Sequence, residues 1–168
     1  MDFLDFFFNS PFGSIVIIYI LVMVLILILY LVWLFYRRKK VKDAIMRLTS
    51  GAQEIPAEEF MRMREVREGK RKISNQSDFT GIYIIHNVTR GMYYVGQSKN
   101  VLKRISSHFG GSGNGDVYAD LKYGNVFTVK AIPLAGSGYS SLDALERDAI
   151  QTYDAFEHGY NKNRGNRR

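Results

Sequence analysis

The chain lacks cysteine altogether, and it has only three histidines among its 168 residues. Disulfides and thiolate metal sites are therefore excluded, so a bound metal ion would need oxygen or imidazole ligands. Positive charge, by contrast, is in excess, with a formal net charge of +7. This excess favours polyanionic partners, either nucleic acid or anionic lipid, without selecting between them.

Charge is missing from one long stretch, the 23 residues from Ser14 to Tyr36, in which Ile, Leu and Val predominate. As a helix it would be about 35 Å long, enough to cross a hydrocarbon core of about 30 Å. Tyr30 and Trp33 lie toward its C-terminal end, as in the aromatic belt of a membrane protein. A buried core helix of this length is improbable in so small a protein. A cleaved signal peptide would have a basic start and a shorter apolar run. We therefore expect residues 14–36 to form a single, uncleaved transmembrane helix in contact with the lipid bilayer.

The charges on either side of this stretch predict its orientation. Residues 37–40 read Arg-Arg-Lys-Lys, whereas residues 1–13 carry only Asp2 and Asp5. Because basic residues flank the cytoplasmic side of membrane spans, we expect the part after the span to be cytoplasmic. Residues 1–13 would then form a short N-terminus outside, either resting in the membrane interface or disordered.

Residues 37–78 read as a basic, partly helical linker. Ser50 and Gly51 interrupt its first helical pattern, and Pro56 precedes an acidic first turn of a second helix. Its basic side chains would either contact nucleic acid or simply line solvated helix faces; they are Arg62, Arg64, Arg67, Lys70, Arg71 and Lys72.

The remainder of the chain predicts a small α/β domain. Two apolar runs, residues 82–85 and 92–95, flank a turn-forming segment that contains Asn87 and Gly91, so they are expected to pair as a β-hairpin. A helix with Asn100 at its N-cap should follow over residues 101–108. Later come a helix over residues 117–123, a third strand over 127–133 and a helical pattern over 141–150.

Two short strings in this hairpin resemble the motifs of the GIY-YIG nuclease family. The first is Gly-Ile-Tyr at 81–83 and the second is Tyr-Val-Gly at 94–96. The family places an arginine, a glutamate and an asparagine downstream, and Arg104, Glu146 and Asn161 follow here in that order. The resemblance implies a three-stranded antiparallel sheet flanked by helices, over residues 79–162. It departs from the family at residues 90–92, where Arg-Gly-Met stands in place of the common Asn-Gly-Lys.

The resemblance also implies how such a site hydrolyses a phosphodiester. Glu146 would hold one Mg²⁺ or Mn²⁺ ion, and the Arg104 guanidinium is matched to phosphate oxygens. A tyrosine would take the proton of the attacking water if a nearby cation lowers its pKa. Tyr83 and Tyr94 are both candidates for that base. His108 lies four residues after Arg104, so it projects from the same helix face and either assists catalysis or is an ordinary surface histidine.

Other residues complete the expected site. The resemblance assigns Asn161 to ordering it, although Gly-Tyr-Asn is equally common in turns. We expect Gly96, Ser98 and Lys103 to contact the substrate, with Ser98 alternatively capping the next helix. Tyr93 must face the opposite side of its strand from Tyr94 and is assigned to packing.

The resulting hypothesis is a membrane-anchored, divalent-metal-dependent endonuclease acting on DNA at the cytoplasmic membrane face. The alternative is a membrane-tethered nucleic-acid-binding or adaptor module that keeps the fold without turnover. A third interpretation makes the domain a regulator of a membrane partner. The sequence has no zinc-finger spacing and no separate DNA-reading module, so site preference should be loose or supplied by a partner. The basic tail at 163–168 could add contacts to backbone phosphate. DNA versus RNA, and homodimer versus monomer, stay open.

Overall fold

The computed structural model of the chain describes residues 10–68 and 78–166, with backbone alone for residues 65–68. Most of the expected outer segment, the linker residues Lys70, Arg71 and Lys72, the Arg67 side chain and the last two tail residues lie outside the described residues. The chain divides into two compact units, residues 1–40 and 41–168.

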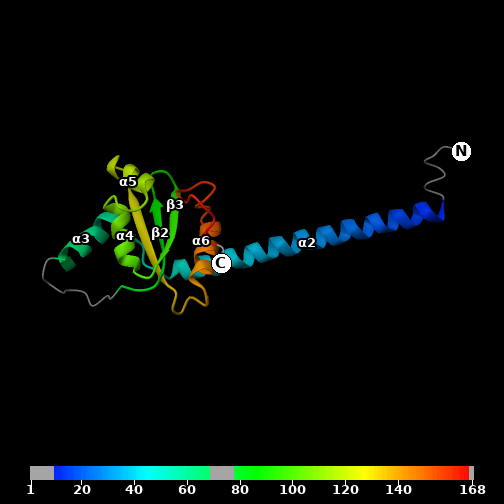
Figure 1. Cartoon of the computed structure of the whole chain (residues 1–168), viewed down its shortest axis with the longest axis horizontal. Coiled ribbons are helices and arrows are strands. Elements are labelled where there is room, and N and C mark those ends of the chain that lie inside the picture. Colours follow the sequence, from blue (N-terminus) through cyan, green and yellow to red (C-terminus); the bar gives the residue numbers. More distant parts are fainter. Residues whose placement is uncertain (1–9, 69–77, 167–168) are drawn as a thin grey trace. The chain divides into compact units, whose positions relative to one another are not determined.

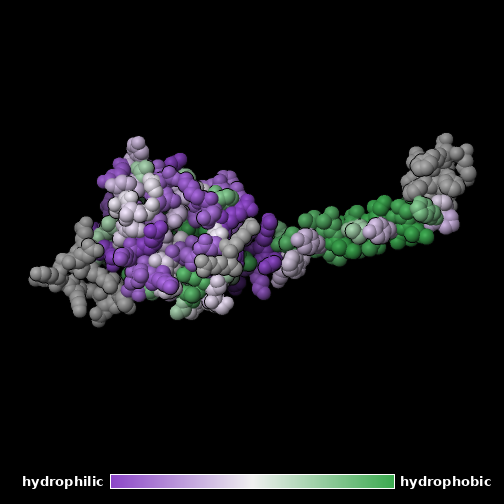
Figure 2. Space-filling model, in the orientation of Figure 1, coloured by the Kyte–Doolittle hydropathy of each residue, from purple (hydrophilic) through white to green (hydrophobic). Residues whose placement is uncertain are grey.

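The first described element is α2, Pro11–Ser50, a 40-residue helix. Its start follows the usual chemistry, because the Ser10 hydroxyl accepts a hydrogen bond from the Gly13 amide at 3.0 Å and Pro11 occupies the first helical position. Its most apolar 18-residue window has a mean hydropathy of 3.5, and none of that window is buried, unlike a soluble core helix. The helix is long and apolar enough to cross a membrane, and its apolar surface is visible in Figure 2.

Helix α2 does not end at residue 36, where the apolar stretch ends. The first expected linker helix is instead a continuation of α2, which stops at Ser50 just before Gly51. The second expected linker helix is α3, Ala57–Glu68, with Glu58 and Glu59 in its first turn. Acidic side chains are favourable there because the N-terminal end of a helix carries partial positive charge.

The sheet contains the three expected strands and one more. Strands β2 (Gly81–Asn87) and β3 (Met92–Ser98) form the predicted hairpin, and β4 (Phe127–Pro133) pairs with the other edge of β2. The addition is β1 (Ile55–Pro56), a two-residue strand from the linker that pairs with β4. All pairings are antiparallel and the order is β1-β4-β2-β3, which leaves β3 at one edge.

Each face of the sheet carries its own core. On one face, β2 and β4 pack against α3 and against α4 (Val101–Phe109), with α5 (Gly115–Lys122) beside them. On the other face they pack against α6 (Leu142–Thr152). Figure 1 shows α4 and α6 on opposite sides of the sheet. Because side chains alternate along a strand, Tyr83 and Ile85 belong to the first core, and Ile82 and Ile84 to the second.

Linker residues contribute to both cores of the 41–168 unit. Ala57 and Phe60 of α3 lie in the first core and Ile45 of α2 in the second, each at most 5% exposed. The Tyr153 hydroxyl also donates to the Thr49 hydroxyl at 2.7 Å. Residues before position 79 therefore take part in the packing that supports the sheet.

The start of α4 differs in one respect from the sequence expectation. Asn100 occupies the N-cap position, but its side chain makes no capping hydrogen bond. The Asp78 carboxylate accepts hydrogen bonds from the Leu102 and Lys103 amides instead, at 2.8 and 3.1 Å. A carboxylate suits a helix N-terminus better than a neutral amide does, because it also meets the positive end of the helix dipole.

Candidate active site

The two motif tyrosines lie on adjacent strands, on the face of the sheet covered by α4. Their ring centroids are 6.1 Å apart, and the His108 ring of α4 lies 5.4 Å from Tyr83 and 4.8 Å from Tyr94. The Tyr83 hydroxyl and His108 Nε2 are 2.9 Å apart. Tyr83 and His108 are buried, whereas Tyr94 is only partly buried. Tyr83 of β2, Tyr94 of β3 and His108 of α4 thus form one cluster between the sheet and α4.

Gly96 makes room for this cluster. It pairs with Tyr83 across the hairpin, and a β-carbon placed on Gly96 would lie 2.3 Å from the Tyr83 hydroxyl oxygen. The space over Gly96 is therefore filled by the Tyr83 ring.

The proton positions in the cluster follow from the partners of His108. The backbone N–H of Asn114 donates to His108 Nδ1 at 2.8 Å. An amide nitrogen can only donate, so Nδ1 is the acceptor and the neutral ring carries its proton on Nε2. The ring therefore donates to the Tyr83 hydroxyl oxygen. Burial, and secondarily the charge of Arg104, lowers the pKa of His108 to about 4, so the ring is neutral at pH 7.

Arg104 lies one turn before His108 on α4 and is exposed. Burial and the neighbouring Tyr94 raise the pKa of Tyr83 well above its ordinary value, while a hydrogen bond and the charge of Arg104 act to lower it. Arg104 and His108 therefore both meet Tyr83, as their i,i+4 spacing predicts.

The two tyrosines are also linked directly. Burial raises the pKa of Tyr94, and the hydrogen bond from Tyr83 acts to lower it. The same interaction acts to raise the pKa of Tyr83. Because the Tyr83 oxygen already accepts from His108 Nε2, the hydrogen of the Tyr83 hydroxyl is left to donate toward Tyr94. The resulting chain of donors runs from Asn114 through His108 and Tyr83 to Tyr94.

Glu146 approaches from α6 on the other face of the sheet. Its side chain is 9% exposed, and Oε2 accepts a hydrogen bond from Gln97 Nε2 at 2.9 Å. The same amide donates to Asp143 Oδ1 at 2.6 Å. Burial raises the pKa of Glu146, and Asp143 adds to this, against hydrogen bonds from Gln97 and Asn166. Glu146 in turn acts to raise the pKa of Tyr94, which relates the two groups electrostatically.

Asn161 supports the edge strand between these groups. Its side-chain oxygen accepts from the Val95 amide at 2.9 Å, and its side-chain nitrogen donates to the Val95 carbonyl at 2.7 Å. Asn161 thus satisfies both backbone groups of the residue between Tyr94 and Gly96.

The three remaining residues take simpler positions. Ser98 accepts a hydrogen bond from the Asn100 amide at 2.9 Å, Lys103 is exposed on α4, and Tyr93 packs in the second core. Gln97, Asp143 and the Asn114 amide are contacts that the sequence reasoning missed. Only Asp143 gave a signal, since it lies three residues before Glu146 on one helix.

Comparison with known families decides what this arrangement is. Residues 79–161 match the family model described as the GIY-YIG catalytic domain. This segment is a GIY-YIG domain. No curated protein and no solved structure matches the chain. A GIY-YIG domain points to nuclease activity and implies a DNA substrate.

The GIY-YIG nucleases generally use divalent metal ions. Glu146 fits such an ion, because its buried carboxylate has a raised pKa and a bound dication would favour its charged form. Within residues 10–68 and 78–166, no three His, Asp or Glu side chains gather as a metal cage. An ion held here would therefore take one carboxylate and otherwise water and phosphate oxygens, which is the habit of Mg²⁺.

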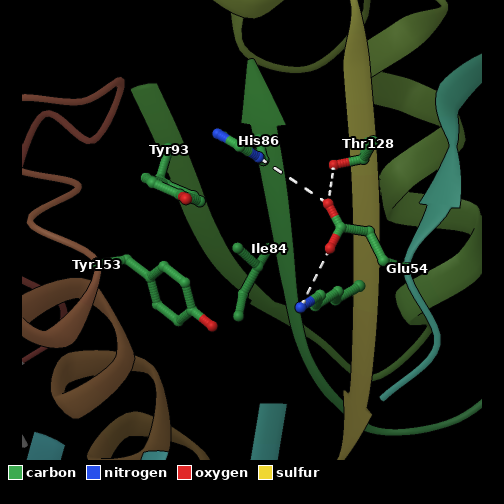
Figure 3. Close-up of a pocket in the computed structure, with 7 residues that line it drawn as sticks. Glu54, Ile84, His86, Tyr93, Thr128 and Tyr153 are labelled. Carbon is green, nitrogen blue, oxygen red and sulfur yellow. Dashed lines mark hydrogen bonds and ion pairs between the residues drawn. The ribbon is translucent and has the colours of Figure 1, made fainter. Parts of the chain in front are cut away.

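A small open pocket of about 50 Å³ lies on the opposite face of the sheet from Tyr83, lined by residues of the GIY-YIG domain and by Glu54. Figure 3 shows the Glu54 carboxylate there, facing Thr128 and His86. Its oxygens lie 2.5 Å from the Thr128 hydroxyl, 3.9 Å from His86 Nδ1 and 3.2 Å from Lys130 Nζ. The His86 and Tyr93 rings stack beside it, with centroids 4.2 Å apart. The Glu54 carboxylate fills the side of the pocket next to Lys130. Because Glu54 belongs to the linker and Lys130 and Thr128 to β4, these contacts hold the linker against the sheet.

Proposed function

We propose that the protein is a membrane-anchored, divalent-metal-dependent endonuclease that hydrolyses phosphodiester bonds of DNA at the cytoplasmic membrane face. The observation that carries this proposal is the convergence of Tyr94, Arg104 and His108 on the buried hydroxyl of Tyr83. Perturbed titratable groups gathered in one cluster are more typical of a catalytic site than of a surface that only binds nucleic acid.

Tyr94 is the base that takes the proton of the attacking water. Tyr83 is 1% exposed, and its hydroxyl is hydrogen-bonded to His108. Tyr94 is less buried, and its hydroxyl oxygen accepts the hydrogen bond that Tyr83 donates. As the water oxygen bonds to phosphorus, its proton passes to the Tyr94 phenolate oxygen. The bond from phosphorus to the leaving oxygen breaks, and this oxygen keeps the electron pair and takes a proton from solvent water. Tyr83 stabilises the Tyr94 phenolate by donating to it.

Arg104 pairs with the phosphate as negative charge builds on its oxygens, since its exposed guanidinium offers a planar fork of donors. Lys103 and Ser98 contact the neighbouring backbone phosphate. Glu146 would hold the metal ion, which would supply Lewis acidity at the phosphate. The Gln97 side-chain amide donates to both Asp143 and Glu146. Asp143 thus holds the amide that orients the Glu146 carboxylate.

The membrane part of the proposal rests on α2. In this proposal residues 14–36 cross the lipid bilayer, which the length and apolar composition of α2 support. The basic run at 37–40 supports a cytoplasmic position for the GIY-YIG domain, because basic residues flank the cytoplasmic side of membrane spans. Cleavage is then confined to nucleic acid that reaches the inner membrane surface. This fits a role at DNA entry or in membrane-localised defence.

The test uses the full chain in lipid nanodiscs with supercoiled plasmid, with Mg²⁺ or with EDTA. We expect Mg²⁺-dependent nicking or linearisation, lost by a factor of at least about 100 in Tyr94→Phe and in Glu146→Gln. Tyr123→Phe and Glu157→Gln are the matched controls, because both residues are exposed and Glu157 pairs with Arg164 and not with a residue of the proposed site. Tight DNA binding without cleavage would instead establish the tethered binding module.

The pH dependence of single-turnover cleavage tests the role of Tyr94. Burial raises the pKa of Tyr94 above its ordinary value, so the reactive phenolate is a minor form at neutral pH and grows with rising pH. We expect the rate to rise about tenfold per pH unit between about pH 6.5 and about pH 8.5. A flat profile over that range would contradict a tyrosine base.

A further inference from the structure

The glycine-rich loop between α4 and α5 lies against the one edge of His108 that the tyrosines do not use. A β-carbon placed on Gly113 would be 2.5 Å from His108 Nδ1 and 2.7 Å from His108 Cα. Gly113 shows no positive φ angle, so glycine is needed here for space and not for backbone conformation. The loop therefore passes directly over the ring.

Asn114, the next residue, is held in place by three hydrogen bonds of its side chain. The Asn114 side-chain oxygen accepts from the Asp116 and Val117 amides at 3.0 and 3.2 Å, which caps α5. Its side-chain nitrogen donates to the Tyr160 carbonyl at 3.1 Å. These contacts fix the Asn114 backbone N–H toward His108 Nδ1.

We propose that Gly113 and the backbone amide of Asn114 are positioning elements that hold His108 in its Nε2–H tautomer. In that tautomer His108 is a donor to Tyr83 and cannot receive the Tyr83 proton. The inference rests on the proposed nuclease function for its consequence, and on the hydrogen bond alone for its geometry.

The consequence concerns the direction of the whole donor chain. With the proton on Nδ1 instead, Nε2 would accept the hydrogen of Tyr83. Tyr83 would then stop donating to Tyr94, and the Tyr94 phenolate would lose its stabilising partner. Arg104, Tyr83 and Tyr94 are the titratable groups that face His108, so their charges act on the same equilibrium.

Two variants of the full chain separate the backbone N–H from the side chain. Asn114→Ala and Asn114→Pro both lose the cap of α5, but only proline also loses the N–H. The Asn114 φ angle of −78° lies within the proline range, so the backbone angle suits proline. The proline Cδ takes the place of the amide hydrogen in front of His108 Nδ1, so the ring must also shift away from the loop. Any loss of cleavage in Asn114→Ala measures the side chain, and the further loss in Asn114→Pro measures removal of the N–H together with the shift of the His108 ring.

The primary measurement is the nitrogen-15 NMR spectrum of the histidine rings in detergent micelles. We expect the Nε2–H form for His108 in the unmodified chain and in Asn114→Ala, and a shift toward Nδ1–H in Asn114→Pro. Cleavage by Asn114→Pro should fall about tenfold below Asn114→Ala, the value of one lost hydrogen bond. An unchanged tautomer in Asn114→Pro would overturn the inference.

A second measurement needs no variant and guards against misfolding of Asn114→Pro. A coupling across the hydrogen bond should join the Asn114 amide nitrogen and His108 Nδ1 in the unmodified chain. Absence of this coupling, together with a proton on Nδ1, would also overturn the inference. If the tautomer is as expected but no DNA is cleaved by the unmodified chain, the proposed function fails and the positioning geometry stands.

Discussion

At the scale of single residues, one atom-sized space decides whether the cluster can form. Tyr83 reaches across the hairpin and places its hydroxyl where any larger residue at position 96 would put a β-carbon. The glycine of the second motif is thus a packing requirement of the tyrosine of the first. The two motifs, thirteen positions apart from Tyr83 to Gly96, act as one unit because the hairpin register brings these positions together.

Gly96→Ala should therefore damage the site while leaving the sheet folded. The methyl group would displace the Tyr83 hydroxyl and break its 2.9 Å contact with His108. We expect unfolding free energy to fall by about 1–3 kcal/mol and cleavage to fall about 100-fold. Gly115→Ala is the control, because a β-carbon there meets no atom within 4 Å. Equal cleavage rates for the two variants, measured on plasmid, would show that Tyr83 does not need its position.

At the scale of elements, the sequence pattern predicted those strands and helices whose bounds depend on residues nearby in the chain. The bounds of β4, residues 127–133, and the helix after Ser141 follow from alternation and capping within a few residues. Strand β1 and the cap of α4 were missed because each depends on a partner far along the chain. Ile55 pairs with Val129, and Asp78 reaches the amides of residues 102 and 103. Two residues carry no alternation to detect, and no local pattern marks a capping residue more than twenty positions away.

The candidate site shows the same division. Motif order was enough to name its residues, and the i,i+4 rule related Arg104 to His108. Which tyrosine donates to the other depends on the Asn114 amide, and that contact forms only when the loop folds over the ring. Proton direction is therefore a tertiary property and could not be predicted from spacing.

The cap of α4 gives a test at this scale. Asp78→Ala should lower the free energy of unfolding by about 1 kcal/mol, because two amides of the first turn lose their acceptor. Asn100→Ala is the comparison, and its cost should be smaller because its side chain makes no capping hydrogen bond. Urea unfolding of both variants measures the difference. A larger loss of unfolding free energy in Asn100→Ala than in Asp78→Ala would show that Asn100 caps α4, as the sequence suggests.

At the scale of the whole molecule, the GIY-YIG domain and the folding unit do not have the same extent. The family model begins at residue 79, whereas the compact unit begins at Val41. Residues between them bury Ile45, Ala57 and Phe60, add β1 to the sheet and place Glu54 against Lys130. Loss of a buried Ile or Phe side chain typically costs about 2–5 kcal/mol, against a total stability of about 5–15 kcal/mol for a small domain.

A fragment of residues 79–168 should consequently fail to fold, and one of residues 41–168 should fold. We expect cooperative thermal unfolding by circular dichroism, with dispersed amide NMR signals, only for the longer fragment. Deleting residues 41–78 removes buried side chains from the cores on both faces of the sheet. Because protein cores are close-packed, the remaining side chains cannot fill the space that these residues leave. Cleavage assays on the shorter fragment would then report misfolding and not chemistry. If residues 79–168 unfold as cooperatively and at as high a temperature, the linker contacts add nothing, and the domain boundary lies where the family model begins.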